Sequence, residues 1–415
     1  MLAFVGVVFG VIALIHYYLW KRLVKDTLRP GRARRAGTIA AVVLAILVPV
    51  TMAGVRSGEI AFLAWPGYMW LALMFYLLVT LAVLEVPRLA LSLWLRHRKH
   101  APEMSPVTAA GEPAAVDDLP AEAGDTVTSR AASRIEAGSD QSGIERRLLL
   151  ARGAAIFAGL TAAGITGYGV KTALGGPQLD RVQLPLAKLP RAMDGTRLAV
   201  VSDIHVGPLA GSRHVSRIVD LINSVQADMV CVVGDLVDGT VAELGPAAAP
   251  LAGIRSRLGA YFVTGNHEYY SGYEPWLEEV TRLGLRPLRN ERVELDGLDL
   301  AGVNDIGGEQ FGDGPDFARA LGDRDPARPV VLMAHQPVAA VQAAPFGVDL
   351  QVSGHTHGGQ MAPFNLLVKL QQPVVSGLGR VDGVPVYVTN GAGFWGPPVR
   401  VGAPPQVTVI ELRTT

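Results

Sequence analysis

Cysteine is almost absent from this chain of 415 residues. The single Cys231 excludes a disulfide within the chain, so the fold depends on packing or on bound metal. Cys231 lies in the apolar run DMVCVVGD, where we expect an inert core thiol. Charge is also scarce, since 18% of the residues are charged and the formal net charge is zero. This balance gives no indication of a nucleic-acid partner, and none is expected.

Apolar residues are abundant instead, and they concentrate in the first 170 positions. They make up 49% of the chain, which is high for a soluble protein of this size. We predict a membrane region of three helices over residues 1–100, with spans at 2–20, 37–55 and about 61–86. A further apolar run at 147–172 follows Arg146 and Arg147, so it is either a fourth transmembrane helix or a twin-arginine-like export signal.

The loop between the first two predicted spans is rich in basic residues. It carries seven Lys and Arg residues between Lys21 and Arg35, whereas the next loop has only Arg56. Basic loops stay in the cytoplasm, so the third span ends on the cytoplasmic side and the apolar run at 147–172 leads out again. Residues 178–415 are therefore expected on the extracytoplasmic side of a bacterial-type cell membrane. Residues 101–146 are rich in Ala, Pro, Glu, Asp and Ser, which predicts a disordered linker.

After Arg197 the chain alternates short apolar runs with amphipathic stretches such as Ser212–Ser224, the pattern of a layered α/β domain. Five apolar runs end in polar motifs: SDIHVG, VVGDLVDG, VTGNHEYY, LMAHQP and GHTHGG. Polar side chains just beyond the carboxyl ends of parallel strands meet in one crevice. The candidate site residues are therefore Asp203, His205, Asp235, Asn266, His267, His335, His355 and His357.

Each motif alone has an ordinary explanation. Asp235 could cap a helix, His335 could be a satisfied core histidine, and Asn266 could be a turn residue. Together they favour a metal site, because five of the six histidines after residue 175 lie in these motifs and only His214 is left over. Nitrogen and oxygen ligands without thiolate suit Mn, Fe, Zn or Co. Seven or eight such ligands suggest two metals that share a carboxylate.

The ordered motif set resembles the calcineurin-like metallophosphoesterase superfamily over roughly residues 195–415. GHTHGGQ and the later NGAGFWGPPVR further resemble the membrane-associated, exported branch of that family. The resemblance implies an α/β fold, a four-layer αββα sandwich, here preceded by an α-helical transmembrane region. It also implies two divalent metal ions and hydrolysis of phosphoester or pyrophosphate bonds by attack of a metal-bridging hydroxide.

The resemblance also implies a role for each motif position. Asp203, His205 and His357 would hold one metal. Asn266, His335 and His355 would hold the other, and Asp235 would bridge them. His267 would act on the substrate, stabilising phosphoryl oxygens or protonating the leaving alkoxide.

Residues outside the motif set are less determined. Asp238 could orient a ligand histidine or be a solvated turn residue, and Glu268 could rim the cleft. Arg400 could pair with a phosphate or form a surface salt bridge, and Phe394 with Trp395 could be ordinary packing. The candidate substrate-binding residues are Arg400, Trp395 and Asn390.

We therefore expect a membrane-anchored phosphohydrolase with a phosphorylated small-molecule or lipid substrate, because the active domain closely follows the last apolar segment. One alternative is an enzyme like the UDP-2,3-diacylglucosamine pyrophosphatase of lipid A synthesis, which relatives in this branch include. That substrate lies on the cytoplasmic side, so the charge of the loops weighs against it. The other alternative is a non-catalytic membrane sensor. Such proteins usually lose ligands, and no motif position is missing here.

Overall fold

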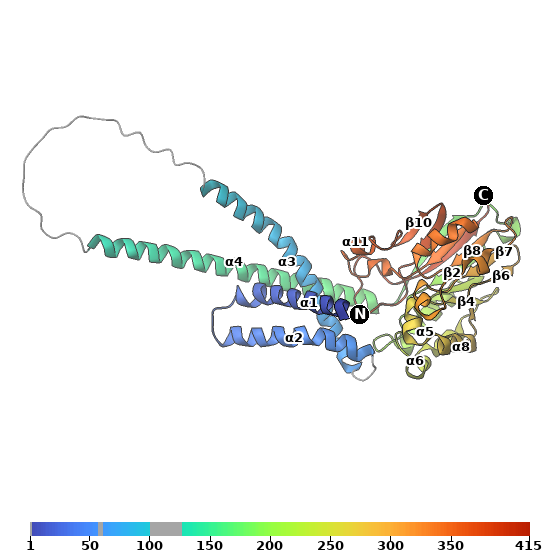
Figure 1. Ribbon diagram of the computed structural model, residues 1–415, viewed down its shortest axis with the longest axis horizontal. Coiled ribbons are helices and arrows are strands. Elements are labelled where there is room, and N and C mark those ends of the chain that lie inside the picture. Colours follow the sequence, from blue (N-terminus) through green and yellow to red (C-terminus); the bar gives the residue numbers. More distant parts are fainter. Residues whose placement is uncertain (1, 57–60, 100–126) are drawn as a thin grey trace, which may run out of the picture. The chain divides into compact units, whose positions relative to one another are not determined.

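The computed structural model describes residues 2–56, 61–99 and 127–415 (Figure 1). The chain divides into two compact units. The first consists of Met1–Ile46 with Leu73–Ala163, and the second of Leu47–Ala72 with Gly164–Thr415. The second unit therefore combines the whole α/β domain with the end of one apolar helix and the start of the next.

Among the described residues, four helices are long and apolar enough to cross a membrane. Their helical character was predicted, whereas crossing of a bilayer stays a prediction. A π-helical turn, η1 (Lys21–Lys25), continues the first helix, and a short 3₁₀ turn, η2 (Ala61–Leu63), precedes the third. The four helices are α1 (Leu2–Trp20), α2 (Arg32–Arg56), α3 (Ala64–Lys99) and α4 (Val127–Leu174).

The fourth helix extends into the predicted linker. Helix α4 begins at Val127, so residues 127–146 of that segment are helical. Ala, Arg, Glu and Gln, which favour helices, supply nine of these twenty residues, and the stretch continues directly into an apolar helix that supplies the nucleus. The rest of the predicted linker, 101–126, lies outside the described residues. Arg146 and Arg147 lie within α4, and an export-signal role for this segment stays a prediction.

Polar contacts join the helices of the first unit. Glu85 of α3 forms an ion pair with Arg22 and accepts a hydrogen bond from the Tyr18 hydroxyl at 3.2 Å. Arg152 of α4 donates to the carbonyl of Thr27, at 3.0 Å. These partners support a structural role for Glu85, because a paired carboxylate near a span end costs little.

The α/β domain contains two six-stranded sheets. In the first sheet β2, β3 and β4 run parallel, and in the second β7, β8, β9 and β11 do. The first sheet has the order β1 (Gln178–Pro185), β12 (Gln406–Arg413), β2 (Arg197–Val201), β3 (Met229–Val233), β4 (Ala260–Val263), β5 (Arg286–Pro287). The second has the order β10 (Gly377–Val381), β11 (Val384–Val388), β9 (Leu350–Ser353), β8 (Val330–Met333), β7 (Leu298–Gly302), β6 (Glu291–Leu295).

The two sheets pack face to face, with helices on both outer faces. Strand β3 shows why: all five of its residues are buried, and alternate side chains point to opposite faces. Met229, Cys231 and Val233 join the core between the sheets, whereas Val230 and Val232 pack under the outer helices. These layers confirm the predicted αββα sandwich. They also confirm Cys231 as a buried core thiol, and burial raises its pKa to about 12.

The outer layers are helical. Helices α5 (Ser212–Ser224), α6 (Val241–Ala248) and α8 (Tyr273–Arg282) cover the first sheet and lie together in Figure 1. Helices α9 (Phe317–Leu321) and α10 (Ala340–Ala343) cover the second. The connections contain η3 (Arg191–Met193), η4 (Ala249–Gly253), α7 (Asn266–Ser271), η5 (Ile306–Phe311), η6 (Pro337–Ala339), η7 (Ala344–Phe346), η8 (His357–Gly359) and α11 (Asn365–Val368).

Candidate metal centre

All five predicted motifs follow the carboxyl ends of parallel strands. The first three follow β2, β3 and β4 of one sheet, and the other two follow β8 and β9 of the other sheet. The side chains of Asp203, His205, Asp235 and His335 are almost inaccessible to water. Buried polar groups of this kind require partners, because each unpaired one costs free energy of folding.

Three of the predicted ligands form a first group. Asp203, His205 and His357 place one ligand atom each within 4.8 Å of one another. The Nε2 atoms of His205 and His357 lie 3.1 Å apart, and His357 Nε2 lies 3.3 Å from Asp203 Oδ1. Ligands bound at about 2.1 Å to one cation stand at roughly such separations from each other, so the group fits a metal ion.

Asp235, His335 and His355 form a second group by the same 4.8 Å criterion. The His335 ring is fixed by a 2.8 Å contact from Nδ1 to the carbonyl of Val233, which turns Nε2 toward Asp235 Oδ2 at 3.1 Å. With the proton on Nδ1, Nε2 carries a free lone pair, the arrangement of a metal-binding histidine. Burial lowers the pKa of His355 to about 3, so this ring is neutral and available as a ligand.

Two buried atoms support the fit to a cation. Among the described residues, Asn266 Oδ1 and His335 Nε2 have no hydrogen-bond partner. Asn266 begins α7, and the next residue, His267, donates its backbone N–H to Asp235 Oδ1 at 2.9 Å. An acceptor oxygen and a ring nitrogen left unpaired in a buried site are groups that a bound cation would satisfy.

Asp235 lies between the two groups. Its Oδ2 is 3.1 Å from His335 Nε2 and 3.8 Å from His205 Nε2. One carboxylate therefore reaches histidines of both groups. This position is the one that a carboxylate shared by two cations would occupy.

The backbone at the site is unusual. Five of the seven predicted ligands have positive φ, an uncommon conformation for residues other than glycine. The φ angles are 51° for Asp203, 48° for His205, 51° for Asp235, 70° for His355 and 51° for His357. Strained residues cluster at functional sites because the surrounding structure must hold them there.

Glu268 holds this strained backbone in place. The prediction that it rims the cleft is wrong, because its side chain is fully buried. Its carboxylate accepts hydrogen bonds from the backbone N–H groups of Asp235 at 2.9 Å, Leu236 at 2.7 Å and Gly265 at 2.6 Å. The Gly265 bond is the glutamate half of a capping box at the start of α7, so the spacing from Gly265 to Glu268 could have revealed it.

Asp238 orients two histidines at once, and the alternative of a solvated turn residue is wrong. Its Oδ1 lies 2.8 Å from His205 Nδ1 and 2.7 Å from His267 Nδ1. The contact with His205 leaves Nε2 of that ring facing the first group. Burial lowers the pKa of His267, but Asp235 and Asp238 outweigh it and raise that pKa to about 9, so His267 is protonated at neutral pH.

Replacing Asp238 with asparagine is expected to weaken metal binding by about 10- to 100-fold, because both rings lose their common acceptor. Titration with Mn²⁺ should show a weaker site in the variant, and the pH profile of the rate should shift. The control is Asp220→Asn, on helix α5, for which no pairing with a histidine is seen among the described residues. Unchanged metal affinity and unchanged rate in Asp238→Asn would show that the two contacts have no functional role.

Arg400 does not face the cleft, so the structure argues against our prediction that it binds a substrate phosphate. It is fully buried, and its guanidinium donates to the backbone carbonyls of Gly393, His357 and Asn390. Arg400 thus fixes the loop around His357 from behind. Asn390 is also mostly buried and bonds to Ser376 and Gln406. Trp395 alone of the three is exposed, and it lines a cavity beside His267.

His214, the histidine outside the motifs, lies buried on α5 beside Phe394. Burial, with the nearby charges of Arg217 and Arg400, lowers its pKa from 6.5 to about 4. As the pH falls from 6.5 to 4, the unfolded chain therefore takes up a proton that the folded chain does not, and the protein loses stability.

We expect His214→Gln to remove this loss. The wild type should lose about 2 kcal/mol more unfolding free energy than the variant between pH 7 and pH 5. Melting temperatures of both proteins at the two pH values measure the difference. An identical pH dependence in the two proteins would contradict the assignment.

Known proteins share this domain. Residues 196–359 match the family model described as calcineurin-like phosphoesterase. A "transmembrane protein with metallophosphoesterase domain" from Danio rerio is 39% identical over 260 residues, covering 59% of this chain and 60% of that protein. An uncharacterized metallophosphoesterase from Helicobacter pylori is 38% identical over 240 residues, covering 57% and 64%. The chain thus spans less than two thirds of the length of these two relatives.

A third relative is matched over most of its length. It is an uncharacterized metallophosphoesterase from Aquifex aeolicus, 32% identical over 243 residues that cover 57% of this chain and 92% of that protein. The aligned part has the size of the α/β domain, without room for the membrane helices. Because this relative is matched almost completely and the family model covers all five motifs, the chain belongs to the calcineurin-like metallophosphoesterase family.

Proposed function

We propose that this protein is a membrane-anchored phosphohydrolase that uses two divalent cations to cleave phosphoester or pyrophosphate bonds. The observation that carries the proposal is the pair of three-residue groups that meet at Asp235. One cation would be held by Asp203, His205 and His357, the other by Asn266, His335 and His355, with Asp235 shared. Mn, Fe, Zn and Co all suit this donor set.

When bound, such cations supply an activated water and neutralise charge on the phosphoryl oxygens. The residues of the chain do the rest. In hydrolysis the water oxygen forms a bond to phosphorus, and the bond from phosphorus to the leaving oxygen breaks. His267, protonated and held by Asp238, donates a proton to that leaving oxygen.

The location of the domain is also a proposal. We place it on the extracytoplasmic side of a bacterial-type membrane, where it would act on lipid-linked or other envelope phosphates. Two facts support this: the loop from Lys21 to Arg35 carries seven Lys and Arg residues, and the opposite end of α2 belongs to the same compact unit as the α/β domain. Protease added to intact cells should therefore cleave the domain, and complete protection would place it in the cytoplasm.

The activity is tested with purified full-length protein. Metal is removed with a chelator, and Mn²⁺ is added back in measured amounts. p-Nitrophenyl phosphate, bis-p-nitrophenyl phosphate and a pyrophosphate diester serve as substrates. Activity should reappear as about two equivalents of metal bind. A protein that binds two metals and cleaves none of these substrates would contradict the proposal and favour a non-catalytic sensor.

A further inference from the structure

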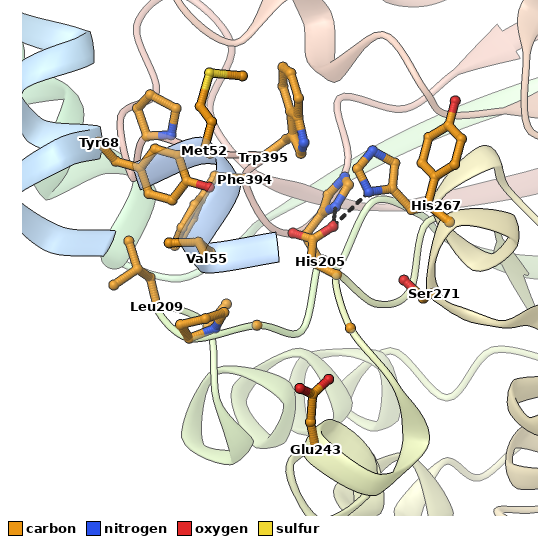
Figure 2. A pocket seen from close by; sticks show the side chains of 18 of the residues that line it. Met52, Val55, Tyr68, His205, Leu209, Glu243, His267, Ser271, Phe394 and Trp395 are labelled. Atoms are coloured by element: carbon orange, nitrogen blue, oxygen red, sulfur yellow. Dashed lines mark hydrogen bonds and ion pairs between the residues drawn. The ribbon is translucent and has the colours of Figure 1, made fainter. Parts of the chain in front are cut away.

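A cavity of about 300 Å³ connects the candidate metal centre to two apolar helices (Figure 2). At one end it is lined by His205, Asp238 and His267. At the other end it is lined by four residues that we call the membrane wall: Met52 and Val55 of α2 with Tyr68 and Leu71 of α3. The whole cavity lies within the second compact unit, so the wall and the catalytic side chains belong to one body.

We propose that the membrane wall binds the apolar chain of a membrane lipid phosphate whose phosphate group lies at the metal centre. This inference rests on the proposed phosphohydrolase function and names the class of its substrate. The apolar helices are then part of the substrate site as well as an anchor. The substrate enters from the bilayer rather than from water.

The side chains opposite the membrane wall are apolar too. Leu209, Phe394 and Trp395 line the cavity, and Trp395 lies between Tyr68 and the histidines in Figure 2. Phe394 is buried, whereas the side chains of Met52 and Trp395 are about half exposed, at 46% and 52%. Large apolar side chains that stay accessible along a cavity are suited to an apolar ligand. When such a ligand binds, its own apolar surface and that of the side chains are both removed from water.

The charge of the cavity points the same way. Among the described residues that line it, none is Lys or Arg, and Asp238 and Glu243 carry negative charge. Apart from bound metal and His267, the cavity lining has no positive charge that could pair with the additional phosphates of a soluble nucleotide. A lipid with one phosphate at the metal centre needs no further cation.

The depth of the membrane wall supports entry from the bilayer. Met52 and Val55 belong to the candidate span Arg32–Val55, and Tyr68 and Leu71 belong to the candidate span Ala61–Ala90. Met52 and Val55 lie in the last turn of their span, close to the lipid head groups, whereas Tyr68 and Leu71 lie about two to three turns inside theirs, at the depth of lipid chains. An acyl or prenyl chain can therefore pass from the bilayer to the wall without crossing water.

The two helices of the membrane wall pack closely on each other, and Tyr68 lies next to the loop that carries Trp395. A Cβ atom on Gly67 would lie 1.8 Å from Thr51 Oγ1, so α2 and α3 touch through a glycine. A Cβ on Gly396 would lie 3.6 Å from the Tyr68 ring. The loop that carries Trp395 is also tied to α4, because Arg400 N–H donates to the carbonyl of Gly169 at 2.9 Å. Both sides of the cavity are therefore held by apolar helices.

The kinetic test uses full-length protein in vesicles of phosphatidylethanolamine and phosphatidylglycerol. Lipid phosphates with chains of 4 to 18 carbons and a polyprenyl phosphate are compared with bis-p-nitrophenyl phosphate. We expect kcat/KM to rise steeply with chain length, and the better long-chain substrate identifies the chain as acyl or prenyl. The double variant Met52→Gln and Leu71→Gln should raise KM for the better long-chain lipid phosphate about tenfold. Its KM for bis-p-nitrophenyl phosphate should stay within twofold of the wild-type value. The matched control is Met69→Gln, which makes the same change at a position outside the cavity lining.

A binding test separates this inference from the proposed function. The same lipid phosphates carrying a diazirine in the chain are irradiated with the metal-loaded His267→Ala variant, and labelled residues are mapped by mass spectrometry. Labels at the membrane wall, Phe394 or Trp395 support the inference even if no substrate is hydrolysed. Labels confined to span positions outside the cavity, such as Val43, overturn it, and so does a kcat/KM that is independent of chain length.

Discussion

Asp235→Asn is expected to reduce phosphohydrolase activity by about a thousandfold or more, equivalent to roughly 4 kcal/mol of transition-state stabilisation. Asparagine keeps the shape of the side chain and loses its negative charge. Asp235 is the carboxylate that reaches histidines of both groups, at 3.1 and 3.8 Å, so no neighbour replaces that charge between two cations. Metal content by mass spectrometry and hydrolysis rates measure the effect, and the variant should retain one metal at most.

The control for this variant is at the other end of the same strand. Asp228 precedes β3 and pairs with Arg257, whereas Asp235 follows the end of β3. Asp228→Asn should keep two metals and activity within about twofold, since the partners of Asp228 are Arg257 and the backbone N–H of Arg197, and neither is a candidate ligand. If Asp235→Asn binds two metals as tightly as the wild type and turns over at the same rate, a shared carboxylate is excluded.

His267→Ala is expected to lower kcat by about 10²- to 10⁴-fold while metal content stays unchanged. The physical reason is loss of the proton donor. Asp238 holds the His267 ring, and His267 lines the cavity in which we place the substrate. The size of the loss should depend on the leaving group. p-Nitrophenolate leaves without a proton, so its ester should be affected least, and an alkyl phosphodiester most.

His214→Gln serves as the histidine control, because His214 lies on α5 and is not one of the cavity residues. It should retain two metals and wild-type rates at pH 7. An equal loss for aryl and alkyl esters in His267→Ala would contradict proton donation and leave binding of the phosphoryl oxygens as the role of His267. A loss of metal in that variant would instead make His267 a ligand.

Local patterns in the sequence predicted most of the α/β domain. The helix predicted at Ser212–Ser224 is α5, with the same bounds, because one face of it is regularly apolar. Apolar runs that end in Gly, Asp or Asn became buried strands, and this pattern placed the candidate ligands at their carboxyl ends. The roles of those ligands remain predictions, because no bound metal tests them.

The remaining features depend on contacts between distant parts of the chain. Asp238 meets His205, 33 positions before it, and Glu268 bonds to Asp235, also 33 positions before it. Arg400 turns inward because the carbonyls of a folded loop surround it, and an isolated arginine in a sequence gives no sign of this. The start of α4 was missed for another reason: once an apolar helix has formed, a polar stretch before it can be added turn by turn without a new nucleus.

The shared packing of the membrane wall and the α/β domain has a practical consequence. A soluble fragment that begins at Gln178 would keep both sheets and every candidate ligand, yet one flank of its cavity would open to solvent. Rates measured on such a truncated protein would describe small, water-borne esters and understate turnover of long-chain compounds. Substrate screens therefore need the intact polypeptide, reconstituted in lipid.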